Sequence, residues 1–511
     1  MARLHEYQGK AILAANGFQI PRGRTVFTAD EAVAAAKELG GEVVIKIQAW
    51  TTGRAGIGGV AFAEKPGEVR AHANRMLAMK VGQFPVEAVL VEEKIDIDRE
   101  FFLSFVIDDA ARAPMIIFAA GGGSGIEERA ASTGRIACEV NRGPSDSAVN
   151  EAVASCGLSP AHAAQLADSI RQLFTAARSV EARSLEINPL VLTKNGEFVA
   201  ADCRITIDDY AVARHPDLEI EIAREFDHPP SALERVAYAV EQNDHRGTFY
   251  FAQLATAAPK GSNGLVGFHG AGGGGSMMSM DAIVNAGFTI ANFTDTSGNP
   301  SASKVYRAAR IILAQPDLVG YFGSGSGVAS QEQYWSAYGL AKAFWELDLN
   351  IPAVIRLGGN TEDRAVDILQ RMSRLLGAPI EGYRKTDAPA TIAGRFAELV
   401  ATGKGTKWKP RAPRVPKFIK EPSATTIPVK GGRVWIDSAH WPQTRGAVET
   451  HSGGLIVDRA GTPVSSVPGE EFAAKDSELL ACDVECRLAG VKGFYLELDI
   501  PGLDELIGGA R

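Results

Sequence analysis

The stretch from Leu185 to Asp202, which reads LEINPLVLTKNGEFVAAD, constrains the fold more than any other part of the chain. Its Asn-Gly dipeptide at 195–196 stands between two apolar runs and favours the two-residue turn of a β-hairpin, because both turn positions need positive φ. Counted outward from that turn, Asn188 and Asp202 reach the same end of the hairpin. Pro189 is a natural place for a bulge that would align them. We therefore expect a hairpin with polar side chains at one end.

The polar end of this hairpin predicts a site for a hard metal ion. Glu186 and Asn188 share one face of the first strand, because side chains two residues apart point the same way. The amide oxygen of Asn188 and the carboxylate of Asp202 suit Mg²⁺, which keeps several waters and bridges to substrate phosphates. The alternative is an ordinary surface hairpin with a polar end, and this stretch alone does not decide between the two.

Length and composition indicate a soluble globular protein of several domains. A chain of 511 residues is too long for one ordinary core, and its hydrophobic and charged fractions are 45% and 22%. The net charge of -8 gives no basic surface for nucleic acid or for an anionic membrane. Without a signal sequence or a long apolar run we expect neither secretion nor a membrane span, and a cytoplasmic location. Five widely spaced cysteines fit a reducing compartment.

A strand lysine precedes a glycine-rich turn in the first part of the chain. The run VVIKI at 43–47 predicts a buried strand, and its Lys46 either snorkels to the strand edge or supplies a cation to a phosphate. The segment TTGRAGIGGV at 51–60 follows. Its glycines let backbone N–H groups converge on an oxyanion, and Arg54 adds a planar charged donor. A glycine-rich loop alone is a weak signal, but its place directly after the strand lysine favours a phosphate site.

From Leu265 onward the chain repeats a strand, a loop and a helix. Apolar runs at 265–268, 289–293, 318–322 and 353–357 each precede a helix-like segment. This alternation predicts a parallel sheet covered on both faces, with ligands bound at the carboxyl ends of the strands. Three loops are expected at that edge, namely 269–276, 295–301 and 323–327.

The last part of the chain changes in composition. Residues 403–428 are rich in proline, lysine and arginine, which predicts an extended linker with solvated charge rather than a packed element. Contact of this basic segment with nucleic acid or another anionic partner is a less favoured alternative. Residues 429–511 contain enough apolar side chains for a small appended domain of unknown role.

Four pieces of sequence, in this order and spacing, identify a family. They are LHEYQ at the start, Gly53-Arg54, LEINPLV, and Pro-Asp-Leu at 216–218. With them the chain resembles the beta, nucleotide-binding subunit of the succinyl-CoA synthetase family over about Met1 to Thr402. The resemblance implies an α/β protein with an ATP-grasp domain in 1–230, followed by a flavodoxin-like (CoA-ligase) parallel α/β domain in 231–402. The linker 403–428 and the small C-terminal appended domain would then follow.

The resemblance also implies an activity and a partner. The family forms an acyl phosphate from a carboxylic acid and ATP or GTP, passes the phosphoryl group through a histidine, and makes a thioester with coenzyme A. That phosphohistidine and the CoA site lie on an alpha subunit. We therefore expect an ADP- or GDP-forming acid–thiol ligase that uses Mg²⁺, acts on a small carboxylic acid, and forms a hetero-oligomer with an alpha-like CoA-binding subunit.

Site residues follow from the resemblance position by position. Residues expected around the nucleotide are Lys46, Gly53, Arg54, Glu92, Ile95 and Glu100. Asn188 and Asp202 match the Mg²⁺ ligands, and Glu186 matches the acid beside the docking position of the histidine. Glu186 and Arg54 are thus the candidate catalytic residues.

The chain departs from the family where the acid binds. Gly56 replaces a lysine of the glycine-rich loop, His269 replaces the asparagine that begins the family's NGAG loop, and 323–329 replaces its GGIVR segment. The last two loops hold the carboxylate in the family, so we expect an acid other than succinate. The candidate substrate residues are His269, Gly325, Ser326 and Gly327.

Other functions remain open at this point. One is a self-sufficient ATP-grasp ligase that joins an acyl phosphate to an amine. Another is a chain that uses its own His269 as the phosphoryl carrier, and a third is a non-catalytic scaffold. A neighbouring reading frame for an alpha-like chain would favour the acid–thiol ligase over all three.

Overall fold

The structure, a computed structural model, describes residues 1–122, 133–224, 226–244, 247–325, 329–403, 405–429, 431–452 and 476–508. It divides into two compact units, Met1–Pro230 (unit 1) and Ser231–Arg511 (unit 2). In these ranges no helix is both long enough and apolar enough to cross a membrane.

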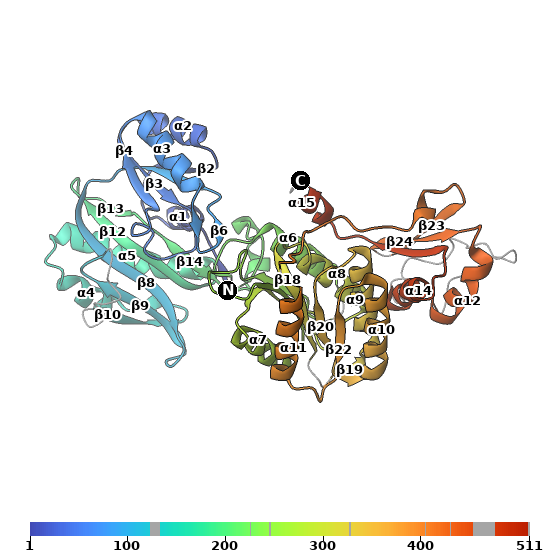
Figure 1. Cartoon of the computed structure of the whole chain (residues 1–511). Helices are drawn as coiled ribbons and strands as arrows, with labels where there is room; N and C mark the ends of the chain where they lie inside the picture. The colour runs from blue at the N-terminus through green and yellow to red at the C-terminus, as the bar shows by residue number, and fades with distance from the viewer. Residues whose placement is uncertain are drawn as a thin grey trace. The chain divides into compact units, whose positions relative to one another are not determined.

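A small antiparallel sheet in unit 1 carries the strand lysine. Its order is β2-β7-β3-β4, and helices α2 and α3 pack on it (Figure 1). Thr28 caps α2, because its hydroxyl accepts from the Glu31 amide while the Glu31 side chain accepts from Thr28. The elements are β2 (Gly23–Val26), α2 (Ala29–Leu39), β3 (Val43–Ile47), β4 (Val60–Ala63), α3 (Pro66–Leu77), the β5–β6 hairpin (Lys80–Val81, Phe84–Pro85) and β7 (Val89–Glu93).

A larger antiparallel sheet forms the rest of unit 1, in the order β1-β14-β12-β8-β9-β10-β11 with β13 paired to β12. Helix α5 covers it with an apolar face that includes Leu166, Ile170 and Leu173. The strands are β1 (Ala2–Arg3), β8 (Ile97–Asp108), β9 (Ala113–Ala119), β10 (Gly134–Glu139), β11 (Gly143–Pro144), β12 (Ala182–Thr193), β13 (Phe198–Ala200) and β14 (Arg204–Ile207). The helices are α1 (Glu6–Ala15), α4 (Asp146–Ala154) and α5 (Pro160–Ser179), and short 3₁₀ turns follow at Val212–Arg214 and Pro216–Leu218.

The predicted hairpin is confirmed, but its two-residue turn is not. The Thr193 amide donates to the Glu197 carbonyl, so the loop spans the three residues 194–196, and of the Asn-Gly pair Gly196 has a positive φ, 84°, while Asn195 does not. Strands β12 and β13 pair antiparallel with Leu190 opposite Ala200 and Val191 opposite Val199. The same register, continued outward, places Asn188 level with Asp202. The pairing of β12 with β8 shifts between Ile187 and Leu190, which is where the proline was expected to cause a bulge.

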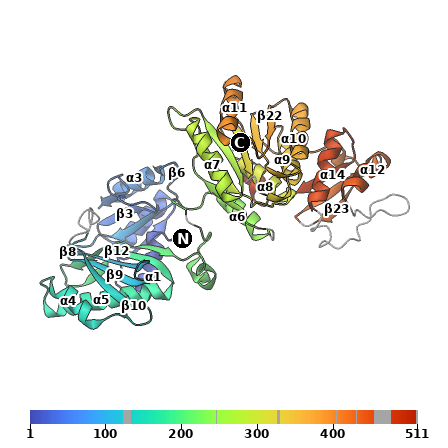
Figure 2. The same cartoon turned by 90° about the horizontal axis from the view of Figure 1, so that it is seen from below.

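Unit 2 is built on a mainly parallel sheet of order β15-β17-β16-β18-β20-β22, in which only the edge strand β15 runs antiparallel. Helices α7 and α11 cover one face and α8, α9 and α10 the other (Figures 1 and 2). The strands are β15 (Tyr250–Gln253), β16 (Leu265–Ala271), β17 (Thr289–Asp295), β18 (Leu318–Gly325), β20 (Ala353–Arg356) and β22 (Ile380–Tyr383). The helices are α6 (Ala232–Gln242), α7 (Gly273–Asn285), α8 (Ala302–Ile312), α9 (Tyr334–Glu346), α10 (Glu362–Leu376) and α11 (Pro389–Thr402). The short strands β19 (Ala329–Glu332) and β21 (Gly359–Asn360) pair with each other.

The glycine-rich segment 269–276 is not the loop that the sequence predicts. His269 belongs to β16, and α7 begins at Gly273. Close packing explains the missing side chain at Gly270, because a Cβ there would lie 2.6 Å from the Ser276 hydroxyl on α7. The loop between strand and helix is therefore very short.

Residues 407–416 of the basic segment form neither helix nor strand, but the prediction that the segment is solvated and unpacked is wrong. Trp408 is fully buried and its indole N–H donates to the Leu313 carbonyl at 2.5 Å. The Arg414 guanidinium lies 4.5 Å from the centre of the Trp345 ring. The packing of these side chains against the rest of unit 2 outweighs the solvation of the charged side chains that the composition suggests.

In its described residues, the C-terminal region forms a three-stranded sheet, β23-β24-β25, and three helices. Helix α14 packs against α8 and α9 (Figure 2). The elements are β23 (Ala424–Val429), β24 (Gly432–Asp437), α12 (Trp441–Ser452), α14 (Asp476–Leu488), β25 (Phe494–Leu498) and α15 (Leu503–Gly508). Strand β23 starts inside the segment that the sequence assigns to the linker.

Candidate active site

A cavity of about 410 Å³ in unit 1 gathers residues from both of its sheets. The strand β3, the glycine-rich turn after it, and the polar end of the β12–β13 hairpin all contribute to its wall. Six of the predicted site residues line it: Lys46, Gly53, Arg54, Glu186, Asn188 and Asp202. Segments up to 156 residues apart in the sequence thus meet at one place.

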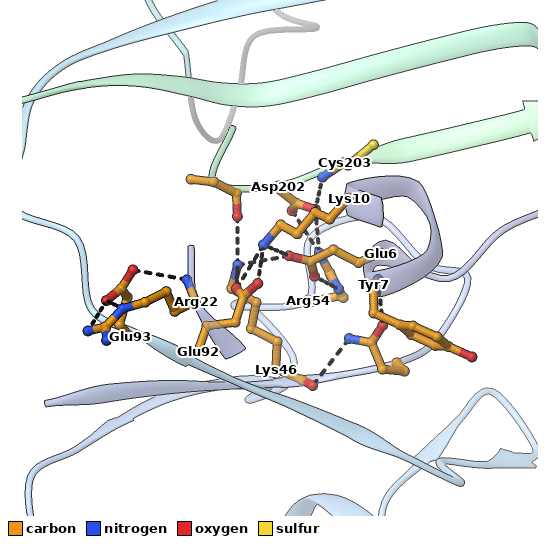
Figure 3. Close-up of polar contacts among 12 residues, drawn as sticks. Glu6, Tyr7, Lys10, Arg22, Lys46, Arg54, Glu92, Glu93, Asp202 and Cys203 are labelled. Carbon is orange, nitrogen blue, oxygen red and sulfur yellow. Dashed lines mark hydrogen bonds and ion pairs between the residues drawn. The ribbon is translucent and has the colours of Figure 1, made fainter. Parts of the chain in front are cut away.

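A buried carboxylate from α1, Glu6, lies at the centre of the charged groups beside this cavity (Figure 3). One of its oxygens is 2.7 Å from Lys10 Nζ and 2.8 Å from Lys46 Nζ, and the other is 2.6 Å from Arg54 Nη1. The Glu6 side chain is only 2% exposed. Its negative charge is therefore matched by three cations in a place from which water is largely excluded.

Arg54 connects this cluster to the hairpin (Figure 3). Its Nη2 donates to both carboxylate oxygens of Asp202, at 2.8 and 2.7 Å. The Lys46 ammonium also donates to the Ala201 carbonyl at 2.7 Å. The two cations predicted for the phosphates are thus oriented from both sides, by α1 and by the hairpin.

The cluster shifts the pKa values of its members. Burial alone would raise the pKa of Glu6, but Lys46, Lys10 and Arg54 hold it below its usual range. Burial alone would lower the pKa of Lys46, but the charges of Glu6 and Glu92 raise it. Both side chains consequently stay ionised at neutral pH. Burial and the charge of Arg54 lower the pKa of the neighbouring His5 to about 4.

Three predicted nucleotide residues are not among those that line this cavity. The Glu92 side chain is 2% exposed and accepts from Lys10 at 2.6 and 2.8 Å. Ile95 lies between β7 and β8 and is half-buried, as is Glu100 on β8. The roles of Glu92, Ile95 and Glu100 in nucleotide binding stay predictions.

The ligand types at the hairpin fit a magnesium ion. Asn188 and Asp202 offer amide and carboxylate oxygens to one cavity. The described residues contain no group of three or more histidine, cysteine or acidic side chains suited to a metal. A magnesium ion at Asn188 and Asp202 would therefore take its other ligands from water and phosphate. Arg54 Nη2 donates to both oxygens of Asp202, and the Cys203 amide donates to Oδ1. The Oδ2 atom keeps a second lone pair for a metal ion.

The predicted substrate residue His269 is buried in unit 2. Its Nδ1 lies 2.7 Å from the Tyr321 hydroxyl and its Nε2 lies 3.0 Å from the Thr296 hydroxyl. Burial lowers the pKa of His269 to about 4, so the ring is neutral at pH 7. With both ring nitrogens engaged, this histidine does not suit a phosphoryl carrier.

A small cavity of about 20 Å³ adjoins this histidine and includes Gly325 in its wall. That volume suits one water molecule rather than a carboxylic acid. Ser326 and Gly327, the other two predicted substrate residues, lie outside the described residues.

Sequence reasoning missed Glu6 and Lys10 as parts of the site. The LHEYQ motif contains Glu6, but neither Glu6 nor Lys10 is among the site residues that the resemblance implies. A signal was present, because an acidic and a basic residue four positions apart share one face of a helix. Their neighbours Leu4, Ile12 and Leu13 are buried, so this pair could have been placed on the inward face of α1.

Comparisons with known proteins identify the first domain and the relatives of this chain. A family model for the ATP-grasp domain matches residues 3–192. The chain is 34% identical over 405 residues to the beta subunit of the GDP-forming succinate–CoA ligase of Thermus thermophilus, covering 78% of this chain and 99% of the relative. It is 31% identical, with the same coverage, to the beta subunit of the ADP-forming ligase of Rubrobacter xylanophilus.

A solved structure supports the fold. ATP citrate lyase from Methanothrix soehngenii, in complex with citrate and coenzyme A, matches with a TM-score of 0.58 at 18% identity, covering 78% of this chain and 99% of that chain. The expected order of an ATP-grasp domain and a mainly parallel, flavodoxin-like α/β domain is confirmed. The chain therefore belongs to the succinate–CoA ligase beta-subunit family, whose members are subunits of ligases.

Proposed function

We propose that this chain is the nucleotide-binding subunit of an ADP- or GDP-forming acid–thiol ligase, which makes an acyl-CoA from a carboxylic acid, coenzyme A and ATP or GTP. One observation carries the proposal: a single cavity brings the phosphate-type cations Lys46 and Arg54 together with the acid Glu186 and the metal-type pair Asn188 and Asp202. Phosphoryl transfer needs this combination of positioning and charge neutralisation more than it needs covalent chemistry.

Each of these side chains has a role in the transfer of the phosphoryl group. Lys46 and Arg54 neutralise the phosphates. The backbone at Gly53, whose φ is 63°, lets the phosphates approach the backbone N–H groups closely. Magnesium held by Asn188 and Asp202 would supply further neutralisation of the phosphate charge. Glu186 orients the histidine that receives the phosphoryl group.

The acceptor histidine belongs to an alpha-like partner that also binds coenzyme A. This assignment is supported by the family and by the state of His269, which is buried with both ring nitrogens engaged. We assign nucleotide binding to residues 1–230 and the acid-selecting loops to 231–402. His269 in place of asparagine indicates an acid other than succinate.

The first experiment is a screen of carboxylic acids for thioester formation, with ATP or GTP, Mg²⁺ and coenzyme A, in the presence and absence of the alpha-like chain. We expect an acyl-CoA and a nucleoside diphosphate only when the partner is present. Formation of an amide or hydroxamate without the partner would instead identify a self-sufficient carboxylate–amine ligase.

A second experiment tests the role of Glu186. Glu186→Gln should lower phosphorylation of the partner's histidine by at least roughly tenfold and leave Mg²⁺–nucleotide affinity unchanged, because the acid orients the acceptor. The matched control is Glu181→Gln, since Glu181 pairs with Arg214 and His215 near the start of β12 and does not line the cavity. Equal effects of both substitutions would contradict the assignment of Glu186.

A further inference from the structure

Arg356 lies at the carboxyl edge of the parallel sheet in unit 2 and has no role in the function proposed above. It is the last residue of β20, which lies between β18 and β22. In the parallel register it stands beside Ser324 on one neighbouring strand and Tyr383 on the other. Because ligands of such sheets bind outside the carboxyl ends of the strands, this position adjoins the segments that we assign to acid selection.

The Arg356 guanidinium donates to backbone carbonyls of two separate segments. Its Nη1 donates to the carbonyl of Gly325, at the end of β18, at 3.4 Å. Its Nη2 donates to the carbonyl of Lys385 at 2.8 Å and its Nε to that of Asp387 at 3.1 Å. One side chain thus connects the end of β18 with the turn 384–387, which follows β22.

This arginine fixes the backbone rather than balancing a charge. It makes no ion pair with any residue that the structure describes, and its hydrogen bonds there go to carbonyls. A guanidinium is a rigid planar fork with five donors, so acceptors on different donors hold fixed positions relative to one another. Gly325 also packs against Arg356, because a Cβ there would lie 3.3 Å from the Arg356 carbonyl oxygen.

The turn 384–387 is itself a compact unit. The Asp387 amide donates to the Arg384 carbonyl at 3.1 Å, and the Asp387 carboxylate accepts from the Arg384 amide at 2.7 Å. The Glu362 carboxylate on α10 accepts from the amides of Lys385 and Gly359, at 3.0 and 3.3 Å. The turn is therefore fastened to the sheet edge from two sides, by Arg356 and by Glu362.

We propose that the turn 384–387 is a third acid-selecting segment, and that Arg356 is the positioning residue that couples it to Gly325. The proposal rests on the proposed function and deepens it, because it adds a segment to the site that chooses the acid. Gly325 and His269, both candidate substrate residues, line the same small cavity. A shift of the turn moves the rigid guanidinium, and this movement reaches the cavity wall through Gly325.

Hydrogen exchange of the full chain, followed by mass spectrometry, measures the coupling without activity. Arg356→Gln should raise the exchange rates of peptides that contain 323–325 and 384–387 by at least roughly tenfold, because both segments lose charge-assisted hydrogen bonds. Arg356→Lys should give the same result, since an ammonium keeps the charge but cannot reproduce the fork. If Arg356→Gln does not fold, Arg356→Lys carries the test.

The matched control is Arg395→Gln. Arg395 on α11 also holds the neighbourhood of β22, but it does so through the carboxylate of Glu381, at 2.8 Å. Its removal should leave the exchange of both segments unchanged.

The activity arm uses acetate, propionate, succinate and malate as probe acids, with the alpha-like partner, coenzyme A and Mg²⁺–nucleotide. Arg356→Gln and Glu362→Gln should each raise KM for the preferred probe by at least roughly fivefold, and leave KM for the nucleotide within about twofold, because the nucleotide binds in unit 1. Glu362→Gln loosens the turn at Lys385 and leaves the Arg356 contacts in place. A purely structural role would instead lower kcat through the folded fraction and leave both KM values unchanged.

The possible results separate the parts of the proposal. Unchanged exchange at 323–325 in Arg356→Gln refutes the coupling, as does wild-type exchange in Arg356→Lys, since the charge alone would then suffice. Faster exchange at 384–387 in Glu362→Gln with an unchanged KM for the acid removes the turn from acid selection. If the wild type makes no acyl-CoA from any acid of the first screen, the proposed function fails and the acid-selecting role with it, while the exchange rates still decide the coupling.

Discussion

The substitution Glu6→Gln tests whether the buried cluster holds unit 1 together. It removes one negative charge and leaves Lys10, Lys46 and Arg54, all of which lie within 2.8 Å of Glu6 in the wild type. Breaking a buried ion pair costs about 3–5 kcal/mol, because the remaining charge stays buried without its partner. The cations keep other partners, since Glu92 still pairs with both lysines and Asp202 with Arg54.

We therefore expect a loss near the lower limit, about 3 kcal/mol of the free energy of unfolding. For a unit the size of Met1–Pro230 this corresponds to a fall in Tm of roughly 6–12 °C. Differential scanning calorimetry measures it, and the transition of unit 1 is recognised by its shift with Mg²⁺–nucleotide.

The loss should depend on pH in a defined direction. Folding lowers the pKa of Glu6, so its contribution is complete above the pKa in the unfolded chain, about 4.3, and is lost as the pH falls toward the folded value. The difference between wild type and Glu6→Gln should be constant from about pH 6 to 8 and should shrink below about pH 4.

The control is Glu93→Gln. Glu93 follows Glu92 in the sequence but pairs with Arg22 at the surface, where its side chain is 31% exposed (Figure 3). An exposed pair contributes about 0–1 kcal/mol. If Glu6→Gln lowers Tm no more than Glu93→Gln does, the buried cluster does not stabilise unit 1.

Three further substitutions test the sites in turn. Asp202→Asn should weaken Mg²⁺-dependent nucleotide binding by at least roughly tenfold in isothermal titration, and an unchanged affinity would refute the metal assignment. Lys46→Met should lower phosphoryl transfer to the partner while the protein stays folded, and full turnover would leave Lys46 only a structural role. His269→Asn should change the preferred acid and leave phosphorylation of the partner intact, whereas loss of an acid-labile phosphate on this chain would identify His269 as the carrier. Folding lowers the pKa of His269 to about 4. The contribution of His269 to the free energy of unfolding should therefore be complete above about pH 6.5 and be lost as the pH falls from there to about 4. The asparagine variant should lack this dependence in acid titrations.

Elements whose signal lies within a few residues were predictable from the sequence. The Asn-Gly dipeptide located the hairpin, but not its register. The three-residue turn of the structure shifts the pairing by one residue from that of the expected two-residue turn, and this observed register places Asn188 level with Asp202. The cap at Thr28 and the strand that carries Lys46 also follow from local patterns, and the structure confirms both. Because backbone geometry translates such short patterns directly into position, one wall of the cavity could be predicted.

The contacts between the walls could not be predicted in the same way. Arg54 is 48 residues from Glu6 and 148 residues from Asp202, and the structure joins all three. Hydrophobic periodicity says which face of a helix is buried, but it does not say which buried charge meets which cation. The sequence therefore indicated Arg54 as a phosphate ligand but not the two carboxylates that orient it.

The C-terminal region shows the same limit, because composition predicts a linker and an appended domain where the structure has shared packing. In unit 2 the Lys342 ammonium lies 2.7 Å from Glu346 on the same helix and 2.5 Å from Asp483 on α14, and all three side chains are at most 3% exposed. Tyr495 on β25 donates to Glu346 at 2.9 Å. Charges buried this deeply need their partners, so a chain cut before α14 would leave Lys342 and Glu346 open to water on the face of α9. Residues 476–508 are therefore part of the core of unit 2 rather than a separable tail.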